Sequence, residues 1–298
     1  MFKTFQDVEQ YLIEQEICKT VVLCGAHDSL ALSAVVEGKR KNIVTPILIG
    51  NSSQIEVLLK KLGESPAKYE IINECSEDAA ANLALRYVYE GKADIPMKGL
   101  LQSSAFIAAM SHPIRGLMDY STLLSEATVF YFPPMDRLLF LADCAINVSP
   151  GLEEKEMILK NTIGLAKAFG ICHVNVAVLS AVEKETPNII SSVDAARLAE
   201  RNYGEDVTVS GPFALDNALD LEAARHKGIT NPVAGNADIL LVPELVSGNF
   251  LHKAVHFFGH YEYASVMLGT KSPVVFNSRT DDARAKYYSI LAAILQTL

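Results

Sequence analysis

The sequence lacks the short motifs of the common nucleotide, hydrolase and zinc-protease sites. No G-x-G-x-x-G follows the apolar run that begins at Val21, and no G-x-x-x-x-G-K-[ST] occurs anywhere. These absences argue against a Rossmann dinucleotide site and against a P-loop. G-x-S-x-G and H-E-x-x-H are also absent, so neither an α/β-hydrolase triad nor a zinc protease is supported.

The five cysteines are odd in number, widely spaced and without a C-x-x-C pair, which argues against a disulfide framework and a zinc site. Cys24 and Cys144 lie in or beside apolar runs and are interpreted as small buried hydrophobic residues. His252, His256 and His260 recur every four residues, but no acidic residue completes a metal set in that series. We therefore expect no metal ion and no permanently bound cofactor.

Long hydrophobic runs and clusters of basic residues are missing as well. Gly, Pro or a charge closes every apolar run within about eight residues, too short for a membrane span. The formal charge is −9, from 35 acidic and 26 basic residues, and the basic residues are scattered, which makes nucleic acid an unsuitable partner. Residues 1–7 lead directly into an acidic amphipathic helix and lack the basic start and apolar core of a signal peptide. We expect a cytoplasmic chain with no membrane partner.

What the chain does contain is a regular alternation of short apolar runs and amphipathic segments of helical length. A chain of 298 residues suits two domains of roughly 150 residues each. The alternation predicts an α/β fold with largely parallel sheets. Strands are expected at 21–24, 43–49, 70–72, 129–132, 138–141, 175–179, 207–209, 239–242 and 274–276, with helices between most of them.

One pair of apolar runs departs from this alternation. The runs at 129–132 and 138–141 are separated only by Pro133-Pro134-Met135-Asp136-Arg137, which predicts an antiparallel hairpin. Such a pair is a plausible place for the chain to enter a second domain. After a helix expected over 245–258, the last strand could return the chain to the first. We predict a first domain of residues 1–120 and 265–298 and a second domain of residues 121–264.

The end of the chain contains the most informative local pattern. The apolar run Pro273-Val274-Val275-Phe276 is followed by the polar segment 277–282 and then by a helical pattern that ends at Leu298. Ser278 stands where a helix N-cap belongs, with Asp281 three residues later. Free N–H groups, a hydroxyl and the Arg279 guanidinium would then meet at one point and could hold a phosphate. The same residues also fit a variant capping box with no ligand.

Other small or polar residues follow the expected strands or the short run Ala93-Asp94-Ile95-Pro96, at the positions where ligands of open α/β sheets collect. These residues include Lys98-Gly99, Ser180, Ser210-Gly211-Pro212 and Gly248-Asn249. Each is weak evidence alone, because ordinary loops use the same residue types. Asp216 and Asn217 either meet a ligand or cap a helix.

Taken in order, these segments resemble the phosphate acetyltransferase and phosphate butyryltransferase family. The similarity runs from about residue 90 to the end, and its most specific part, Gly211-Pro212-Phe213-Ala214-Leu215-Asp216-Asn217-Ala218, is more similar to the butyryl branch. The segments that carry the resemblance are Met97-Lys98-Gly99-Leu100, Val178-Leu179-Ser180-Ala181-Val182-Glu183, the block just named, Gly248-Asn249 and Asn277-Ser278-Arg279.

The resemblance implies an enzyme that exchanges a short acyl group, butyryl or similar, between coenzyme A and inorganic phosphate. Coenzyme A would be a substrate, and its thiolate would attack the acyl phosphate directly in a ternary complex. The implied fold has two α/β/α domains with an interdomain cleft, as in isocitrate and isopropylmalate dehydrogenases, and the implied active form is a homodimer or a multiple of it. The residues implied are catalytic Ser278, Arg279 and Asp281 or Asp282, and substrate-binding Lys98, Gly99, Ser180, Gly211, Asp216, Asn217, Gly248 and Asn249.

Three positions depart from the family pattern. Relatives place an acid about six or seven residues after the serine, where this chain has Arg284 and Ala285. Ser210 stands where many relatives have aspartate, and Phe257 replaces an arginine of the acetyl branch, which would suit a longer acyl chain.

Two other functions remain possible at this stage. The missing acid fits a non-catalytic, regulatory protein of the same fold that binds acyl-CoA. A metal-dependent dehydrogenase of the related fold would need a cluster of aspartates, for which Asp194, Asp216 and Asp220 are available, but no matching motif is found.

Overall fold

The computed structural model describes all residues from 1 to 298, and the chain forms two compact units. The terminal unit comprises Phe5–Tyr120 and Ala264–Leu298, and the central unit comprises Met1–Thr4 and Ser121–Tyr263. The chain leaves the terminal unit after Tyr120 and returns to it at Ala264. Met1–Thr4 belong to the central unit, where the Phe2 N–H donates to the carbonyl of Phe169 at 3.1 Å.

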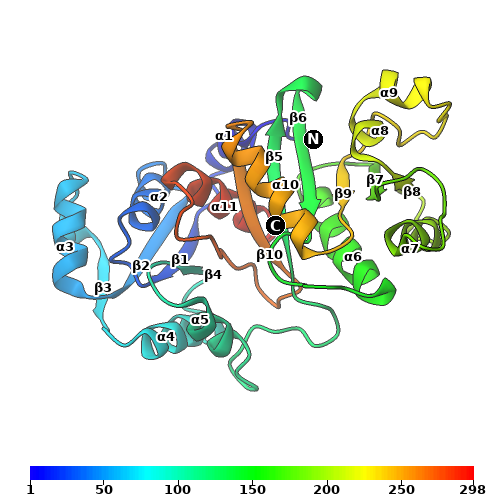
Figure 1. Cartoon of the computed structure of the whole chain (residues 1–298). Coiled ribbons are helices and arrows are strands. Elements are labelled where there is room, and N and C mark those ends of the chain that lie inside the picture. Colours follow the sequence, from blue (N-terminus) through cyan, green and yellow to red (C-terminus); the bar gives the residue numbers. More distant parts are fainter. The chain divides into compact units, whose positions relative to one another are not determined.

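The terminal unit is built around a four-stranded parallel sheet with the order β3-β2-β1-β4. Its strands are β1 (Lys19–Cys24), β2 (Val44–Gly50), β3 (Glu70–Asn73) and β4 (Ile95–Lys98). Its helices are α1 (Phe5–Glu14), α2 (Ser29–Arg40), α3 (Ser52–Lys61), α4 (Glu77–Tyr89), α5 (Ser103–Met110) and α11 (Ala283–Leu295), with a short 3-10 turn, η1, at Pro66–Lys68. Helices α2 and α11 pack together on one side of the sheet, and α4 lies on the other (Figure 1).

The local sequence explains these elements. The apolar residues of β1 are fully buried from Val21 to Cys24, as a strand covered on both faces requires. Asp28 caps α2 by accepting the N–H groups of Leu30 and Ala31, and Ser76 caps α4 through the N–H of Ala79. Helix α11 is buried on every side from Ala285 to Leu295, which identifies it as the central helix of this layer.

The strand predicted at 274–276 forms only isolated bridges. Val275 pairs in parallel with Met97 of β4, and Val274 pairs antiparallel with Met267 of β10 (Tyr263–Leu268), the strand that returns the chain to this unit. The pairing stops there because the chain turns away at Asn277. The prediction of a strand was therefore wrong in extent, although it placed residues 274–276 correctly beside the sheet.

The central unit has a mostly parallel sheet with the order β5-β6-β9-β7-β8. Its strands are β5 (Ser125–Phe132), β6 (Arg137–Ala142), β7 (Val174–Leu179), β8 (Val207–Phe213) and β9 (Ile239–Leu241). Its helices are α6 (Leu152–Ala168), α7 (Ile190–Ala199), α8 (Leu215–Leu219), α9 (Leu221–His226) and α10 (Leu245–Phe257), and the 3-10 turn η2 (Pro133–Met135) joins β5 to β6. The antiparallel pairing of β5 with β6 confirms the predicted hairpin, and the α/β class with largely parallel sheets is confirmed.

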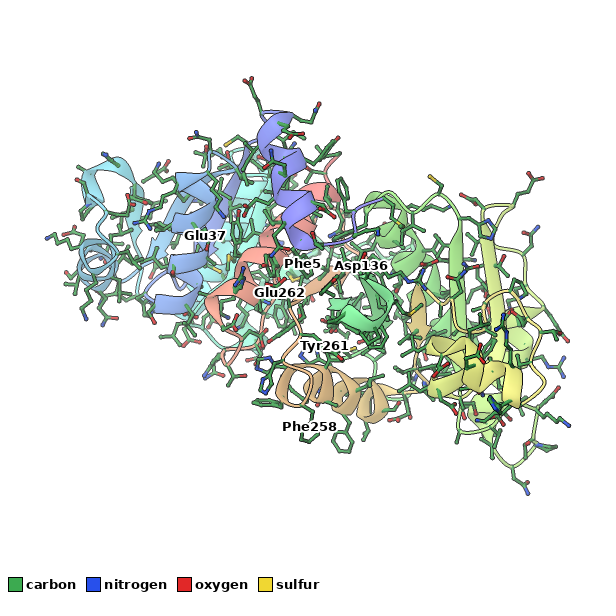
Figure 2. The ribbon with its side chains drawn as sticks, turned by 90° about the horizontal axis from the view of Figure 1, so that it is seen from above. Phe5, Glu37, Asp136, Phe258, Tyr261 and Glu262 are labelled. Carbon is green, nitrogen blue, oxygen red and sulfur yellow. The ribbon has the colours of Figure 1, made fainter.

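Aromatic side chains order the segment that follows α10. Tyr261 stacks on Phe130 of β5 with a centroid distance of 6.5 Å, whereas Phe258, just beyond the helix, is 88% exposed (Figure 2). Phe257, the predicted acyl-chain contact, is 61% exposed. Among the helices of the structure, none is long and apolar enough to cross a membrane.

Candidate functional site

The sheet of the terminal unit has a topological switch point between β1 and β4. Strands β1, β2 and β3 follow one another outward, and β4 lies on the other side of β1. In open α/β sheets, ligands bind in the crevice at the carboxyl ends of the strands where the strand order reverses in this way. The two loops that leave this point are in close contact. The Gly99 N–H donates to the carbonyl of Cys24 at 2.8 Å, and a Cβ added at Gly99 would lie 2.4 Å from the carbonyl oxygen of Gly25.

The segment 277–282 runs past the same end of β4. The Lys98 N–H donates to the carbonyl of Val275 at 3.0 Å, which places Asn277 beyond the carboxyl end of the sheet. Within the segment, the buried Asp281 carboxylate accepts the N–H of Ser278 at 3.0 Å and the side-chain amide of Asn277 at 3.2 Å. Asn277 also donates to Ser289 Oγ of α11 at 3.0 Å. These contacts fix the backbone of the loop before any ligand binds.

The predicted N-cap is wrong. Helix α11 begins at Ala283, and its N-cap is Asp282, whose carboxylate accepts the N–H of Ala285 at 2.8 Å. Ser278 lies four residues before this cap, in a separate turn. An aspartate competes well with serine for the cap position, and residues 277–281 are thereby left to form a loop rather than the first helical turn.

Several groups of this loop are available to a ligand. Ser278 and Arg279 are exposed. The N–H groups of Arg279 and Thr280 donate to no acceptor of the chain, and successive free N–H groups of this kind make an anion-binding concavity. Arg279 Nη2 donates to the carbonyl of Leu101 at 3.3 Å, which orients the guanidinium beside the loop that follows β4.

Two lysines are buried next to this loop. Lys98, the last residue of β4, is 2% exposed, and Lys286 of α11 is 1% exposed. Lys98 Nζ donates to the carbonyl of Gly99 at 3.3 Å and lies 5.6 Å from the centre of the Phe276 ring, while Lys286 Nζ donates to the carbonyl of Ser278 at 2.7 Å. Neither ammonium forms an ion pair with a carboxylate of the chain. Buried cations without such a partner are costly to a fold.

The electrostatic environment of Lys98 follows from this geometry. Burial lowers the pKa of the Lys98 ammonium, and the positive charges of Lys286 and Arg279 lower this pKa further. Three cationic side chains therefore surround the switch point, two of them shielded from water. A bound anion would relieve the repulsion among them and favour their charged forms.

The two candidate acids differ in their surroundings. Asp281 is 2% exposed, and one oxygen of its carboxylate accepts two hydrogen bonds from the loop. Asp282 is exposed and uses one carboxylate oxygen as the helix cap. The structure thus brings together Ser278, Arg279, Lys98 and Gly99 at one end of the sheet, and it gives Asp281 the role of shaping the loop.

In the central unit, Asp216 and Asn217 lie in the first turn of α8 and belong to a polar cluster. The amide of Asn217 donates to Glu183 Oε1 at 2.9 Å, and Lys227 Nζ pairs with Glu183 at 2.7 Å and with Asp216 at 2.9 Å. The Lys227 ammonium lowers the pKa of both carboxyl groups. The N-cap of α8 is Ala214, so neither Asp216 nor Asn217 caps this helix. Ser180, the residue after β7, contacts Ser191 Oγ of α7 through its own Oγ at 2.9 Å.

The glycines predicted to approach a substrate have a packing explanation. A Cβ at Gly211 would lie 3.0 Å from the side chains of Ala195 and Val178, and a Cβ at Gly248 would lie 2.2 Å from the carbonyl oxygen of Asp143. Asn249 donates to the carbonyl of Cys144 at 3.3 Å. Their substrate-binding roles stay predictions, as do those of Ser180, Asp216 and Asn217.

We predict that Gly248→Ala destabilises the protein by about 1–3 kcal/mol, because the new methyl group would force α10 away from Asp143. Gly164→Ala is the matched control in α6 of the same unit, where an added Cβ meets nothing within 4 Å. That control should gain about 0.5–1 kcal/mol from helix propensity. Denaturant unfolding of both variants checks the pair, and an equal effect of the two substitutions would contradict this role of Gly248.

Two buried charged residues near these sites, Lys286 and Asp143, were not predicted from the sequence. Lys286 is the one charged residue in the otherwise uncharged, buried stretch 285–295 of α11, and this isolation in an apolar helix was a usable signal. Asp143 follows β6 and is 3% exposed, and its carboxylate accepts the N–H groups of Ala145 and Ile146. A single aspartate after a strand is too common a feature to have been singled out.

The cysteines, histidine and aspartates that the sequence offered as alternative sites have structural explanations. Cys24 and Cys144 are buried, as predicted, and burial raises the pKa of the Cys24 thiol to about 12. His252 contacts Thr128 Oγ1 at 2.9 Å. Asp194 pairs with Lys155 at 2.5 Å, and Asp220 caps α9. No group of three or more His, Cys, Asp or Glu residues in the structure is arranged to hold a metal ion.

Residues 78–294 match the family described as phosphate acetyl/butaryl transferase. A phosphate butyryltransferase of Clostridium acetobutylicum is 37% identical over 298 residues, which cover 99% of this chain and 98% of that relative. A phosphate acetyltransferase of Rhizobium meliloti is 36% identical over 90% of this chain and 85% of its own length.

A solved structure has the same fold as this chain. The crystal structure of a branched-chain phosphotransacylase from Enterococcus faecalis V583 superimposes with a TM-score of 0.84 at 30% identity, and the match covers 93% of this chain and 98% of that one.

Proposed function

The chain belongs to the phosphate acetyl/butaryl transferase family, and from this premise we propose that it transfers a short acyl group, butyryl or similar, between coenzyme A and inorganic phosphate. As a member it is a phosphate butyryltransferase-like acyltransferase. One observation supports the phosphate half of this proposal most directly. The end of β4 carries two buried ammonium groups that have no carboxylate partner, beside a loop with free N–H groups and an exposed arginine.

In this proposal the phosphate binds at the 277–282 loop. The Arg279 guanidinium holds two phosphate oxygens in its planar fork, and the N–H groups of Arg279 and Thr280 donate to the same anion. The Lys98 ammonium supplies charge from the end of β4. A low-dielectric, positively charged site binds phosphate without a metal ion, and it binds the phosphate of an acyl phosphate in the same way.

The transfer step joins the coenzyme A sulfur to the acyl carbon. The thiol loses its proton to a carboxylate, the thiolate attacks the carbonyl carbon of the acyl phosphate, and the bond from that carbon to the phosphate oxygen breaks. Phosphate leaves with the bonding electron pair and stays held by Arg279. The Ser278 hydroxyl stabilises the negative charge that develops on the carbonyl oxygen. The reverse reaction passes through the same arrangement from acyl-CoA and phosphate.

The proton acceptor is proposed to be Asp282 rather than Asp281. A free thiol has a pKa near 8.5, so only a few per cent is ionised at neutral pH and a nearby base accelerates the reaction. Asp282 is exposed and keeps one carboxylate oxygen outside its helix-capping bond, whereas Asp281 is buried within the loop. The homodimer implied by the resemblance belongs to the same proposal.

The test is thiol release from butyryl-CoA in the presence and absence of inorganic phosphate. We expect release that requires phosphate and saturates with it, and stoichiometric formation of butyryl phosphate. A panel of acetyl-, propionyl-, butyryl- and isobutyryl-CoA then identifies the preferred acyl group, since each methylene changes selectivity by roughly 1–3 kcal/mol. Tight binding of acyl-CoA without phosphate-dependent thiol release would overturn the proposal and favour a regulatory protein that binds acyl-CoA.

A further inference from the structure

Lys286 has no evident structural reason to be a lysine. Its neighbours in α11 from Ala285 to Leu295 are all buried and uncharged, and Lys286 itself is 1% exposed. A lysine is almost never fully buried unless it is paired. Its one hydrogen bond is the donation from Nζ to the carbonyl of Ser278 at 2.7 Å, and Ser278 is the residue to which the transfer step assigns the oxyanion contact.

The hydrogen bond acts on a specific part of the loop. The Ser278 carbonyl accepts from Lys286 Nζ and, more weakly, from the N–H of Asp281 at 3.2 Å, while the Ser278 N–H donates to the Asp281 carboxylate. Hydrogen bonds therefore fix both the N–H and the carbonyl group of Ser278. Ser278 and the next residue, Arg279, are nevertheless exposed.

The charge of Lys286 acts on a second residue. Burial is the main cause that lowers the pKa of Lys286, and it is opposed by the carboxylates of Asp28, Asp281 and Asp282. The titratable groups that act on the pKa of Lys98 are the charged side chains of Lys286, Arg279 and Asp28 and the buried thiol of Cys24, and Lys286 has the largest effect among them. The two ammonium groups are thus electrostatically coupled across the loop.

We propose that Lys286 is a positioning residue for phosphate: its ammonium fixes the carbonyl of Ser278, so that the Ser278 hydroxyl and the Arg279 guanidinium face the anion, and its charge strengthens the positive field around Lys98. This inference rests on the proposed function for its role in turnover. Its role in anion binding is independent of the acyl group and of the proton acceptor.

The first test is Lys286→Met, which keeps the length and apolar stem of the side chain and removes the donor and the charge. We expect kcat for phosphate-dependent thiol release to fall roughly tenfold to a hundredfold, the effect of displacing catalytic groups by a fraction of an ångström to one ångström. The KM for butyryl-CoA should not change. Ile290→Val, a buried substitution one turn later in the same helix that removes no hydrogen bond, is the control for lost stability alone and should keep the wild-type kcat.

The pH profile of phosphate binding separates positioning from packing. Lys98 must be protonated to attract phosphate, so binding is lost as the pH rises through its pKa. Removing the neighbouring positive charge raises that pKa, so the alkaline limb of phosphate binding in Lys286→Met should move to higher pH even though the affinity at neutral pH is weaker. A packing defect alone would weaken binding without moving this limb.

Calorimetric titration with inorganic phosphate measures the affinity for phosphate without turnover, and so separates the role of Lys286 from the proposed acyl transfer. If the wild-type protein binds phosphate but shows no thiol release, the proposed function fails and the calorimetric comparison still decides the role of Lys286. An Lys286→Met protein with the wild-type phosphate affinity and an unmoved alkaline limb would overturn the inference. Should this variant not fold, NMR of the wild-type protein labelled at lysine Cε decides the matter: two buried lysine resonances must respond to phosphate, and the absence of any response would overturn the inference.

Discussion

Replacing Ser278 with alanine should lower kcat by about a hundredfold to a thousandfold and leave the fold intact, as is typical for the loss of one oxyanion donor. The exposed hydroxyl contacts only Thr280 Oγ1, at 3.1 Å, whereas the backbone of Ser278 is held by Asp281 and Lys286. The substitution therefore removes a reacting group and little structural support. Phosphate-dependent thiol release and the thermal unfolding midpoint measure the two effects separately.

Ser53→Ala is the control for this variant. Ser53 is an exposed serine of α3 in the same unit, and its replacement should change neither activity nor the unfolding midpoint. Turnover of Ser278→Ala at the wild-type level would remove Ser278 from the mechanism. A large drop in its unfolding midpoint would show that the hydroxyl has a structural role instead.

Arg279→Lys should raise the apparent KM for phosphate roughly tenfold to a hundredfold. A charge-assisted hydrogen bond contributes about 1.5–3 kcal/mol, each 1.4 kcal/mol corresponds to about a tenfold change in affinity, and an ammonium cannot reproduce the two-point fork of a guanidinium. The guanidinium is already oriented by its contact with the carbonyl of Leu101. Initial rates at varied phosphate and saturating butyryl-CoA give the comparison.

The chain offers a matched control for this substitution. Arg284 lies five residues later and uses its Nε to donate to the Tyr288 hydroxyl at 2.8 Å. Arg284→Lys should leave the KM for phosphate unchanged. The account of Arg279 is wrong if both substitutions change this KM equally, or if Arg279→Lys leaves it at the wild-type value.

The sequence predicted the α/β class and the hairpin, because both depend on local patterns. Apolar runs of strand length and the Pro-Pro turn are visible in a single segment of chain. The exact start of the last helix was missed because Ser278 and Asp282 are both good caps, and the choice between them depends on the contact between the Ser278 N–H and the buried Asp281.

The contribution of Lys286 could not be predicted from local sequence for a different reason. Its partner is a carbonyl eight residues earlier in the chain, and its burial results from packing against other elements of the unit. Gly99 is a second example. From the sequence it is a loop residue that could approach a ligand, but in the structure a Cβ at this position would collide with the carbonyl oxygen of Gly25, which lies more than seventy residues away in the chain. Long-range contacts of this kind are set by the fold rather than by the segment.

The central claim is that the 277–282 loop and the end of β4 form an anion site in the terminal unit. A crystal structure of the wild-type protein in saturating phosphate tests this claim most directly. The account predicts a tetrahedral anion within about 2.7–3.2 Å of the Arg279 guanidinium and the free N–H of Thr280, on the side of the loop where the Ser278 hydroxyl is exposed. Phosphate bound elsewhere, with this loop empty, would contradict it.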